Sequence, residues 1–162
     1  MRTWRFVDRL LGVVIGVAKW LALPLILFLF LQWPLRDIAH CCAREANDLG
    51  QWIFALFVAV SVTAATRAGT HLSTDVLAAR YSPRMRDLIY RIGAAATLIP
   101  WSMFVIYASK DTVLNSVRGL EAFPDTFNPG YFIIKLALWL LAGCMILQAV
   151  LIVTRPSRRG EA

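Results

Sequence analysis

The sequence predicts an all-α membrane protein with four transmembrane helices and with both chain termini in the cytoplasm. Apolar residues make up 59% of the 162 residues and charged residues 17%, whereas charged residues are about 25% of a soluble domain. The formal net charge of +7 does not indicate a nucleic-acid partner, because the basic residues lie beside apolar segments, as in the cytoplasmic loops of membrane proteins. We therefore expect a membrane protein that binds no nucleic acid.

Four segments have the roughly 20 apolar residues that a helix needs to cross a bilayer. They are expected over residues 10–35, 49–66, 88–117 and 131–154. Any bend in the first is expected at Pro24, because proline removes a helical hydrogen bond. Pro129 just before the fourth segment and Pro156 just after it mark its limits. No internal repeat or low-complexity linker is visible, so residues 1–162 are expected to form a single membrane domain.

Arginines set the expected orientation. They gather before the first segment, between the second and third, and after the fourth: Arg2, Arg5, Arg9, Arg67, Arg80, Arg84, Arg86, Arg91, Arg155, Arg158 and Arg159. The other two loops are poorer in arginine and carry acidic residues. Because loops rich in Lys and Arg stay in the cytoplasm, the termini and the middle loop are expected there, and an even number of spans independently requires both termini on one side.

The middle loop has a periodicity of its own. Leu72, Val76, Leu77 and Ala79 fall near one helical face, and Ser82-Pro83 would end a helix. The pattern predicts a short amphipathic helix over residues 72–81, lying in the inner membrane interface. An irregular loop remains the alternative.

No chemistry is indicated inside the membrane. No Asp or Glu falls in the middle of a predicted span, although proton coupling requires a titratable group there. His71 and Asp75 have the i, i+4 spacing of a hydrogen-bonded pair, but the sequence places no nucleophile beside them, and two ligands are too few for zinc. We expect no catalytic residue, no metal site and no cofactor on this chain.

Some basic and aromatic residues in the spans are candidate contacts to a partner subunit or to lipid, and a bound phospholipid is compatible with them. They are Lys19, Arg91, Trp101 and Trp139. For Lys19 the alternative is that the helix starts later and that the side chain reaches the inner surface. Lys135 is near enough to the outer surface to reach it in the same way.

Two stretches carry a family resemblance. Residues 65–77 contain the pattern R-x-G-x-H-x-x-x-D-x-L, formed by Arg67, Gly69, His71, Asp75 and Leu77, and residues 128–135 read N-P-G-Y-F-I-I-K. With both, and over nearly its whole length, the chain resembles the small permease (DctQ-like) subunit of the tripartite ATP-independent periplasmic (TRAP) transporters. The second stretch most resembles small permeases for mannitol, chloroaromatic or 2-oxo acid uptake.

Arg67, Gly69, His71 and Asp75 are interpreted as a structural motif. Gly69 suits the left-handed position that follows a helix. Arg67 can bond the last carbonyls of its helix. The four residues would then terminate the second span and fix the turn into the interfacial helix.

The resemblance also implies an assembly in a bacterial inner membrane. A large permease (DctM-like) would carry substrate and sodium, and a periplasmic substrate-binding protein would deliver an organic acid. The small subunit would brace the large one and help dock the binding protein. Candidate docking residues are Arg44, Glu45, Asp48, Glu121 and Asp125. Many small permeases have a Trp followed by paired acidic residues at the start of the second span, whereas here the acids are separated and Trp52 follows them.

Two other functions were weighed. A self-sufficient homodimeric exporter would need the membrane carboxylate that the spans lack. A membrane anchor for a respiratory-type enzyme would hold haem through paired histidines within the spans, and His40 and His71 lie outside them on opposite sides.

Overall fold

The computed structural model describes residues 2–68 and 81–154. Its elements are α1 (Arg2–Ala18), a 3₁₀ turn η1 (Lys19–Leu21), α2 (Ala22–Asp37), α3 (Ala43–Ala68), α5 (Pro83–Arg118) and α6 (Tyr131–Thr154). By length and composition four helical stretches could cross a membrane, namely Phe6–Asp37, Ala43–Ala68, Arg84–Arg118 and Tyr131–Thr154. The prediction of an all-α protein with four long apolar helices is confirmed. The interfacial helix expected over residues 72–81, with Gly69, His71 and Asp75, falls outside the described residues except at its last position.

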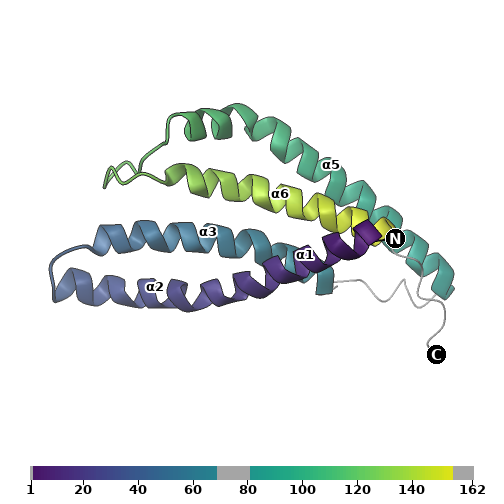
Figure 1. The fold of residues 1–162 in the computed structure, drawn as a ribbon, viewed down its shortest axis with the longest axis horizontal. Helices are drawn as coiled ribbons and strands as arrows, with labels where there is room; N and C mark the ends of the chain where they lie inside the picture. The colour runs from purple at the N-terminus through teal and green to yellow at the C-terminus, as the bar shows by residue number, and fades with distance from the viewer. Residues whose placement is uncertain (1, 69–80, 155–162) are drawn as a thin grey trace.

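The long helices lie side by side in a row, in the order α2, α3, α6 and α5 (Figure 1). The central helices α3 and α6 run in the same direction, with α2 packed on the outer side of α3 and α5 on the outer side of α6. The buried share of the apolar stretch is 39% in α6 and 28% in α3, but 11% in the first span and 6% in α5. The row therefore leaves much apolar surface exposed rather than enclosing a large core.

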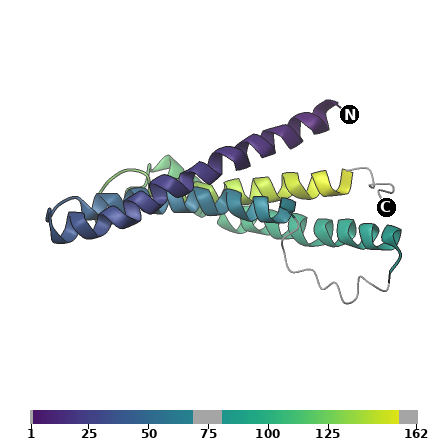
Figure 2. The ribbon, with the colours of Figure 1, turned by 90° about the horizontal axis from the view of Figure 1, so that it is seen from below.

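The first span is a helix broken once. Its two halves, α1 and α2, are joined by η1 at Lys19–Leu21. Pro24 lacks the N–H that would bond the carbonyl of Trp20. The chain tightens just before it, where the Ala22 N–H donates to Lys19 O in an i, i+3 bond and also to Trp20 O. Any bend in the first span was expected at Pro24, and the irregular turn lies before that residue, at Lys19–Leu21. Beyond the break, α1 inclines away from the plane of the row (Figure 2).

Two helices begin before the apolar spans that the sequence predicted, because polar residues ahead of each span are also helical. Helix α3 begins at Ala43, six residues before the predicted start, and Glu45 in its first turn suits the positive end of the helix dipole. Helix α5 begins after Ser82, whose hydroxyl accepts from the Met85 N–H at 3.4 Å, with Pro83 in the first turn. Only α6 has the predicted bounds, because an apolar run and a helix coincide there.

Candidate functional site

The most structured polar region is at one end of the row. We call it the loop end; it comprises the turn at residues 38–42 and the segment at residues 119–130. In α3, Asp48 is 6% exposed. One of its carboxylate oxygens, Oδ2, accepts from Thr126 Oγ1 at 2.5 Å and from Asn128 Nδ2 at 3.4 Å. Since Asp48 is distant in sequence from the other two, these bonds tie the segment before α6 to the start of α3.

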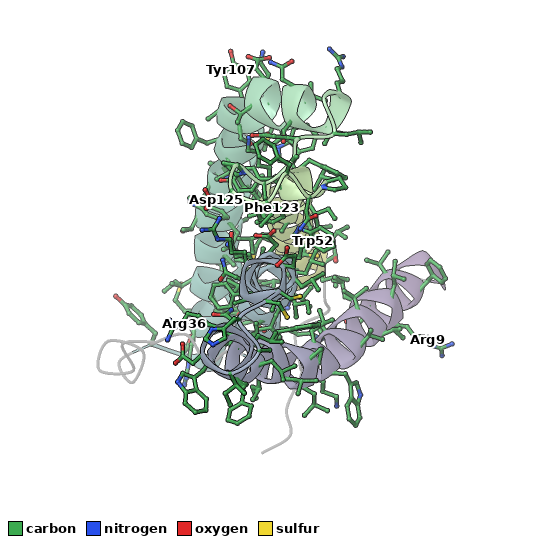
Figure 3. The ribbon with its side chains drawn as sticks, turned by 90° about the vertical axis from the view of Figure 1, so that its left-hand side faces the viewer. Arg9, Arg36, Trp52, Tyr107, Phe123 and Asp125 are labelled. Carbon is green, nitrogen blue, oxygen red and sulfur yellow. The ribbon has the colours of Figure 1, made fainter. Side chains whose placement is uncertain are left out.

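Aromatic packing supports the same connection. Phe123 is 3% exposed, with its ring centroid 6.3 Å from that of Trp52 and 5.4 Å from that of Tyr131. Figure 3 looks onto the loop end and shows Trp52 and Phe123 together near the middle of the row. Gly130 has a φ of +129° and lies against the indole of Trp52. The segment is therefore a packed element and not a loose connection.

An ion pair closes this region. Lys135 Nζ is 2.5 Å from Glu121 Oε2, and the hydrogen bond from Lys135 is the main reason that the pKa of the Glu121 carboxyl lies below its usual value. Lys135 was expected to reach toward the surface, and it does so by bonding this loop residue. The folded carboxyl has the lower pKa, so the pair stabilises the fold above the unfolded pKa of Glu121, and this contribution disappears as the pH falls through the folded value.

Of the five residues predicted to dock a binding protein, three are exposed and two are held by contacts within the chain. Arg44, Glu45 and Asp125 are exposed. Asp48 is buried and bonded to Thr126 and Asn128, because α3 begins earlier than predicted and turns this side chain inward. Glu121 is half-buried and paired with Lys135.

The opposite end of the row, which we call the termini end, is held by Arg67. Its Nη2 is 2.8 Å from Asp8 Oδ1, and its Nη1 donates to the Asp8 backbone carbonyl at 3.2 Å. The sequence suggested that Arg67 bonds the last carbonyls of its own helix. In the structure these two contacts join the end of α3 to α1 instead, because α1 crosses that end.

The remaining candidate contact residues lie in different surroundings. Arg91 is 3.0 Å from the carboxylate of Asp87 and donates to the Val153 carbonyl at 3.4 Å. The Trp139 indole donates to Ser109 Oγ at 3.0 Å, so its polar atom is satisfied within the chain. Trp101 is 44% exposed, and Lys19 is also exposed. Trp101 and Lys19 thus remain accessible to a partner.

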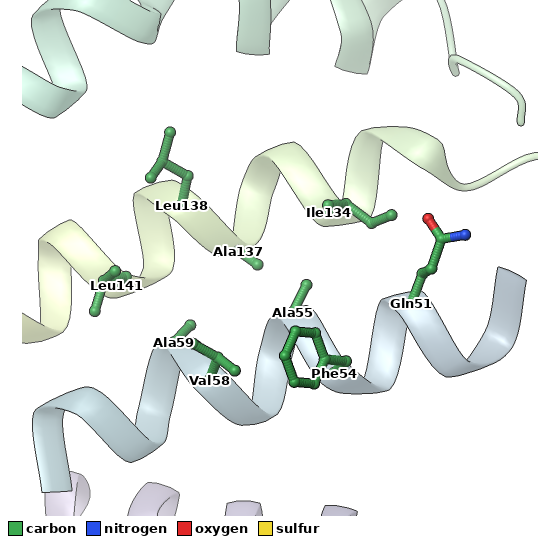
Figure 4. A pocket seen from close by; sticks show the side chains of 9 residues that line it. All are labelled: Gln51, Phe54, Ala55, Val58, Ala59, Ile134, Ala137, Leu138 and Leu141. Atoms are coloured by element: carbon green, nitrogen blue, oxygen red, sulfur yellow. The ribbon is translucent and has the colours of Figure 1, made fainter. Parts of the chain in front are cut away.

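One face of the row is hollowed between its central helices. A groove of about 350 Å³ is lined from α3 and α6, and nearly all its lining is apolar (Figure 4). It exists because small side chains face each other there, namely Ala55 and Ala59 on α3 and Ala137 on α6. Gln51 contributes the polar side chain near the loop end.

Exchanging the two charges tests whether the ion pair between Arg67 and Asp8 holds α1 to α3. We expect Arg67→Asp to lower the free energy of unfolding by on the order of 1 kcal/mol, because both side chains are partly exposed and the pair is partly screened. Adding Asp8→Arg should restore part of the loss, which is measured by thermal unfolding in detergent. Asp125→Arg, at an exposed position, is the matched control. If the double variant is no more stable than Arg67→Asp alone, the pair does not hold α1 to α3.

Sequence reasoning missed the partners of the site. Thr126, Phe123 and Asp8 carried no signal, because their roles depend on contacts with residues far along the chain. Asn128 and Gly130 did carry a weak one. The run Asn128-Pro129-Gly130 is typical of a turn, and it directly precedes α6.

Comparison with known proteins identifies the family. The sequence model described as "Tripartite ATP-independent periplasmic transporters, DctQ component" matches residues 25–159, which is most of the chain. No curated protein and no solved structure matches the chain. The match includes α3, α5 and α6 and the whole loop end. The chain therefore belongs to the family of DctQ components, the small permease subunits of TRAP transporters.

Proposed function

We propose that this chain is the scaffold subunit of a sodium-coupled TRAP transporter for an organic acid, located in a bacterial inner membrane. It braces a large permease that carries sodium and solute, and it helps to dock a periplasmic substrate-binding protein. The observation that carries the proposal is the family match over residues 25–159. The family is a transporter component, which argues against an enzyme anchor.

The fold suits a bracing role. Little of the first span and of α5 is buried, 11% and 6% of their apolar stretches, so a large apolar area is left for a partner, and membrane helices associate through close packing and a few polar contacts. In the described ranges 2–68 and 81–154, the acidic residues lie in the connecting segments or within about two turns of an end of a membrane-length helix. A partner is therefore the expected source of the ion-coupling groups.

The loop end suits docking. The packed 119–130 segment presents Asp125, while Arg44 and Glu45 are exposed on the first turn of α3. These exposed charges would meet complementary charges on the binding protein. Because exposed ion pairs are screened by salt, docking is expected to weaken as the ionic strength rises.

Reconstitution tests the function. Liposomes containing the large permease and this chain, supplied with the binding protein and an inward sodium gradient, should accumulate solute. Leaving out this chain should reduce uptake to background. The solutes offered should include mannitol, a chloroaromatic acid and a 2-oxo acid, because the family match does not distinguish them. Equal uptake without this chain, or uptake by this chain alone, would refute the scaffold role.

The orientation can be tested separately. We expect the termini end in the cytoplasm and the loop end in the periplasm, on the basis of the arginine distribution. Alkaline phosphatase, which is active only in the periplasm, should be active when fused after Leu120 and inactive when fused after Arg84. The opposite pattern of activities would show that the chain is inverted.

A further inference from the structure

Two contacts fix the level of Lys19 along the row of helices. Toward the loop end, Gln32, which bonds Asn47 at the start of α3, is thirteen residues away, or about 20 Å of helix. Toward the termini end, Leu11 is eight residues away, or about 12 Å, and it packs in one buried cluster with Cys144 and Leu151 in the second half of α6. Lys19 therefore lies level with the middle of α6, whose 24 residues are about 36 Å long.

If α6 spans the bilayer, a lysine side chain at this level reaches neither surface. Half of a bilayer core is about 15 Å, and a lysine side chain extends about 6 Å. At this level along the row, the alternative in which Lys19 reaches the inner surface is disfavoured by distance. No residue in the described ranges 2–68 and 81–154 makes a hydrogen bond or ion pair with the ammonium. An unpaired ammonium inside a bilayer is costly, so it needs an acceptor from outside the chain.

The surroundings of Lys19 leave room for another helix. Gly12, Gly16 and Lys19 recur at spacings of four and three residues, which places them on one side of α1 and its end. A Cβ added to Gly12 or Gly16 would have no atom within 4 Å, and Leu23 is 60% exposed. A neighbouring backbone can approach closely over the two glycines and bring its side chains beside Lys19.

We infer that a transmembrane helix of the large permease packs on this side of the first span and pairs a carboxylate with Lys19. The inference rests on the proposed function, because it assumes that the large permease is the partner. A phospholipid is a poorer occupant, because its phosphate lies at the membrane surface, beyond the reach of the side chain. A second copy is also disfavoured, because a symmetric contact would place two Lys19 ammonium groups close together.

The test measures how much large permease is recovered with affinity-tagged variants of this chain from nanodiscs. Lys19→Arg should recover within about twofold of the wild-type amount, because the charge is kept. Lys19→Met, which is similar in length but uncharged, should recover about tenfold less, and Lys19→Glu less still. Gly16→Leu should also recover about tenfold less, because its side chain would separate the two helices.

Two controls separate this contact from a general loss of folding. Gly93→Leu changes a glycine on α5 that has the same open space, and Val17→Leu changes a 62% exposed residue on a different side of α1. Both should recover normal amounts of large permease. Circular dichroism and monodispersity should be unchanged in all variants.

A photo-crosslinking amino acid at Leu23 identifies the neighbour directly. A crosslink to the large permease supports the inference, whereas a crosslink to a second copy, or to lipid alone, overturns it. Normal recovery of the large permease by Lys19→Met and Lys19→Glu also overturns it, while leaving the proposed function intact. Failure of the wild-type chain to recover any large permease instead refutes the proposed function, and this inference with it.

Discussion

Replacing Gly130 by alanine is expected to destabilise the loop end by about 2–6 kcal/mol. The new Cβ would lie 1.9 Å from Cζ2 and 2.6 Å from Cε2 of the Trp52 indole, far inside contact distance, and the indole is held by Phe123. The φ of +129° adds backbone strain for any residue with a side chain. Thermal unfolding of the purified subunit in detergent should show the loss as a lowered Tm.

The control is Gly143→Ala, because a Cβ at Gly143 in α6 would have no atom within 4 Å and alanine favours a helix. It should be neutral or slightly stabilising. Combining Gly130→Ala with Trp52→Ala should cost less than the sum of the two single changes, because the collision is removed while the strain remains. A Gly130→Ala subunit as stable as Gly143→Ala would show that the contact with Trp52 is not rigid.

The four long apolar helices could be predicted from the sequence, because length and apolarity are properties of a continuous segment. The run from Tyr131 to Thr154 is both an apolar run and a helix, so its bounds were predicted. Helix α3 was predicted too short because Ala43–Asp48 is polar but helical. Hydropathy marks the membrane part of a helix and carries no information on a helical extension beyond it.

The arrangement of the helices and the site could be predicted only in part. The row depends on which faces pack, and the apolar residues of α6 are spread all around the helix, so its pattern selects no partner. The pairing of Arg67 with Asp8 joins residues on two different spans. Arg67 was predicted to bond the last carbonyls of its own helix, and its partner Asp8 could not be found from local spacing.

The contacts of Asp48 also join residues far apart in the sequence, so they could not be predicted from local spacing. Removing them is expected to cause the second large loss of stability. As a sequence feature Asp48 is one of several acids in a loop-like region, which is why it was assigned to docking. Its helix turns it inward, where Thr126 and Asn128 both donate to one carboxylate oxygen. Hydrogen bonds to a buried charge are stronger than neutral ones, and donors left without an acceptor incur a desolvation cost.

Asp48→Ala is therefore expected to lower the free energy of unfolding by about 2–4 kcal/mol and to expose the 119–130 segment to proteolysis. Thr126→Val should reproduce part of the effect, because it removes the donor at 2.5 Å. Asp125→Ala is the matched control: it removes an acid from the same segment at an exposed position and should change stability by less than about 0.5 kcal/mol.

The two variants should also differ in the liposome uptake assay, measured at several salt concentrations. There, Asp125→Ala is expected to have the larger effect on salt dependence. Asp125→Ala should reduce the salt dependence of binding-protein-driven uptake, whereas Asp48→Ala should lower uptake at every salt concentration, because it loosens the segment that presents Asp125. If Asp48→Ala leaves the segment protected from protease and changes only the salt dependence, Asp48 is a docking residue after all and its burial is relieved in the assembled transporter.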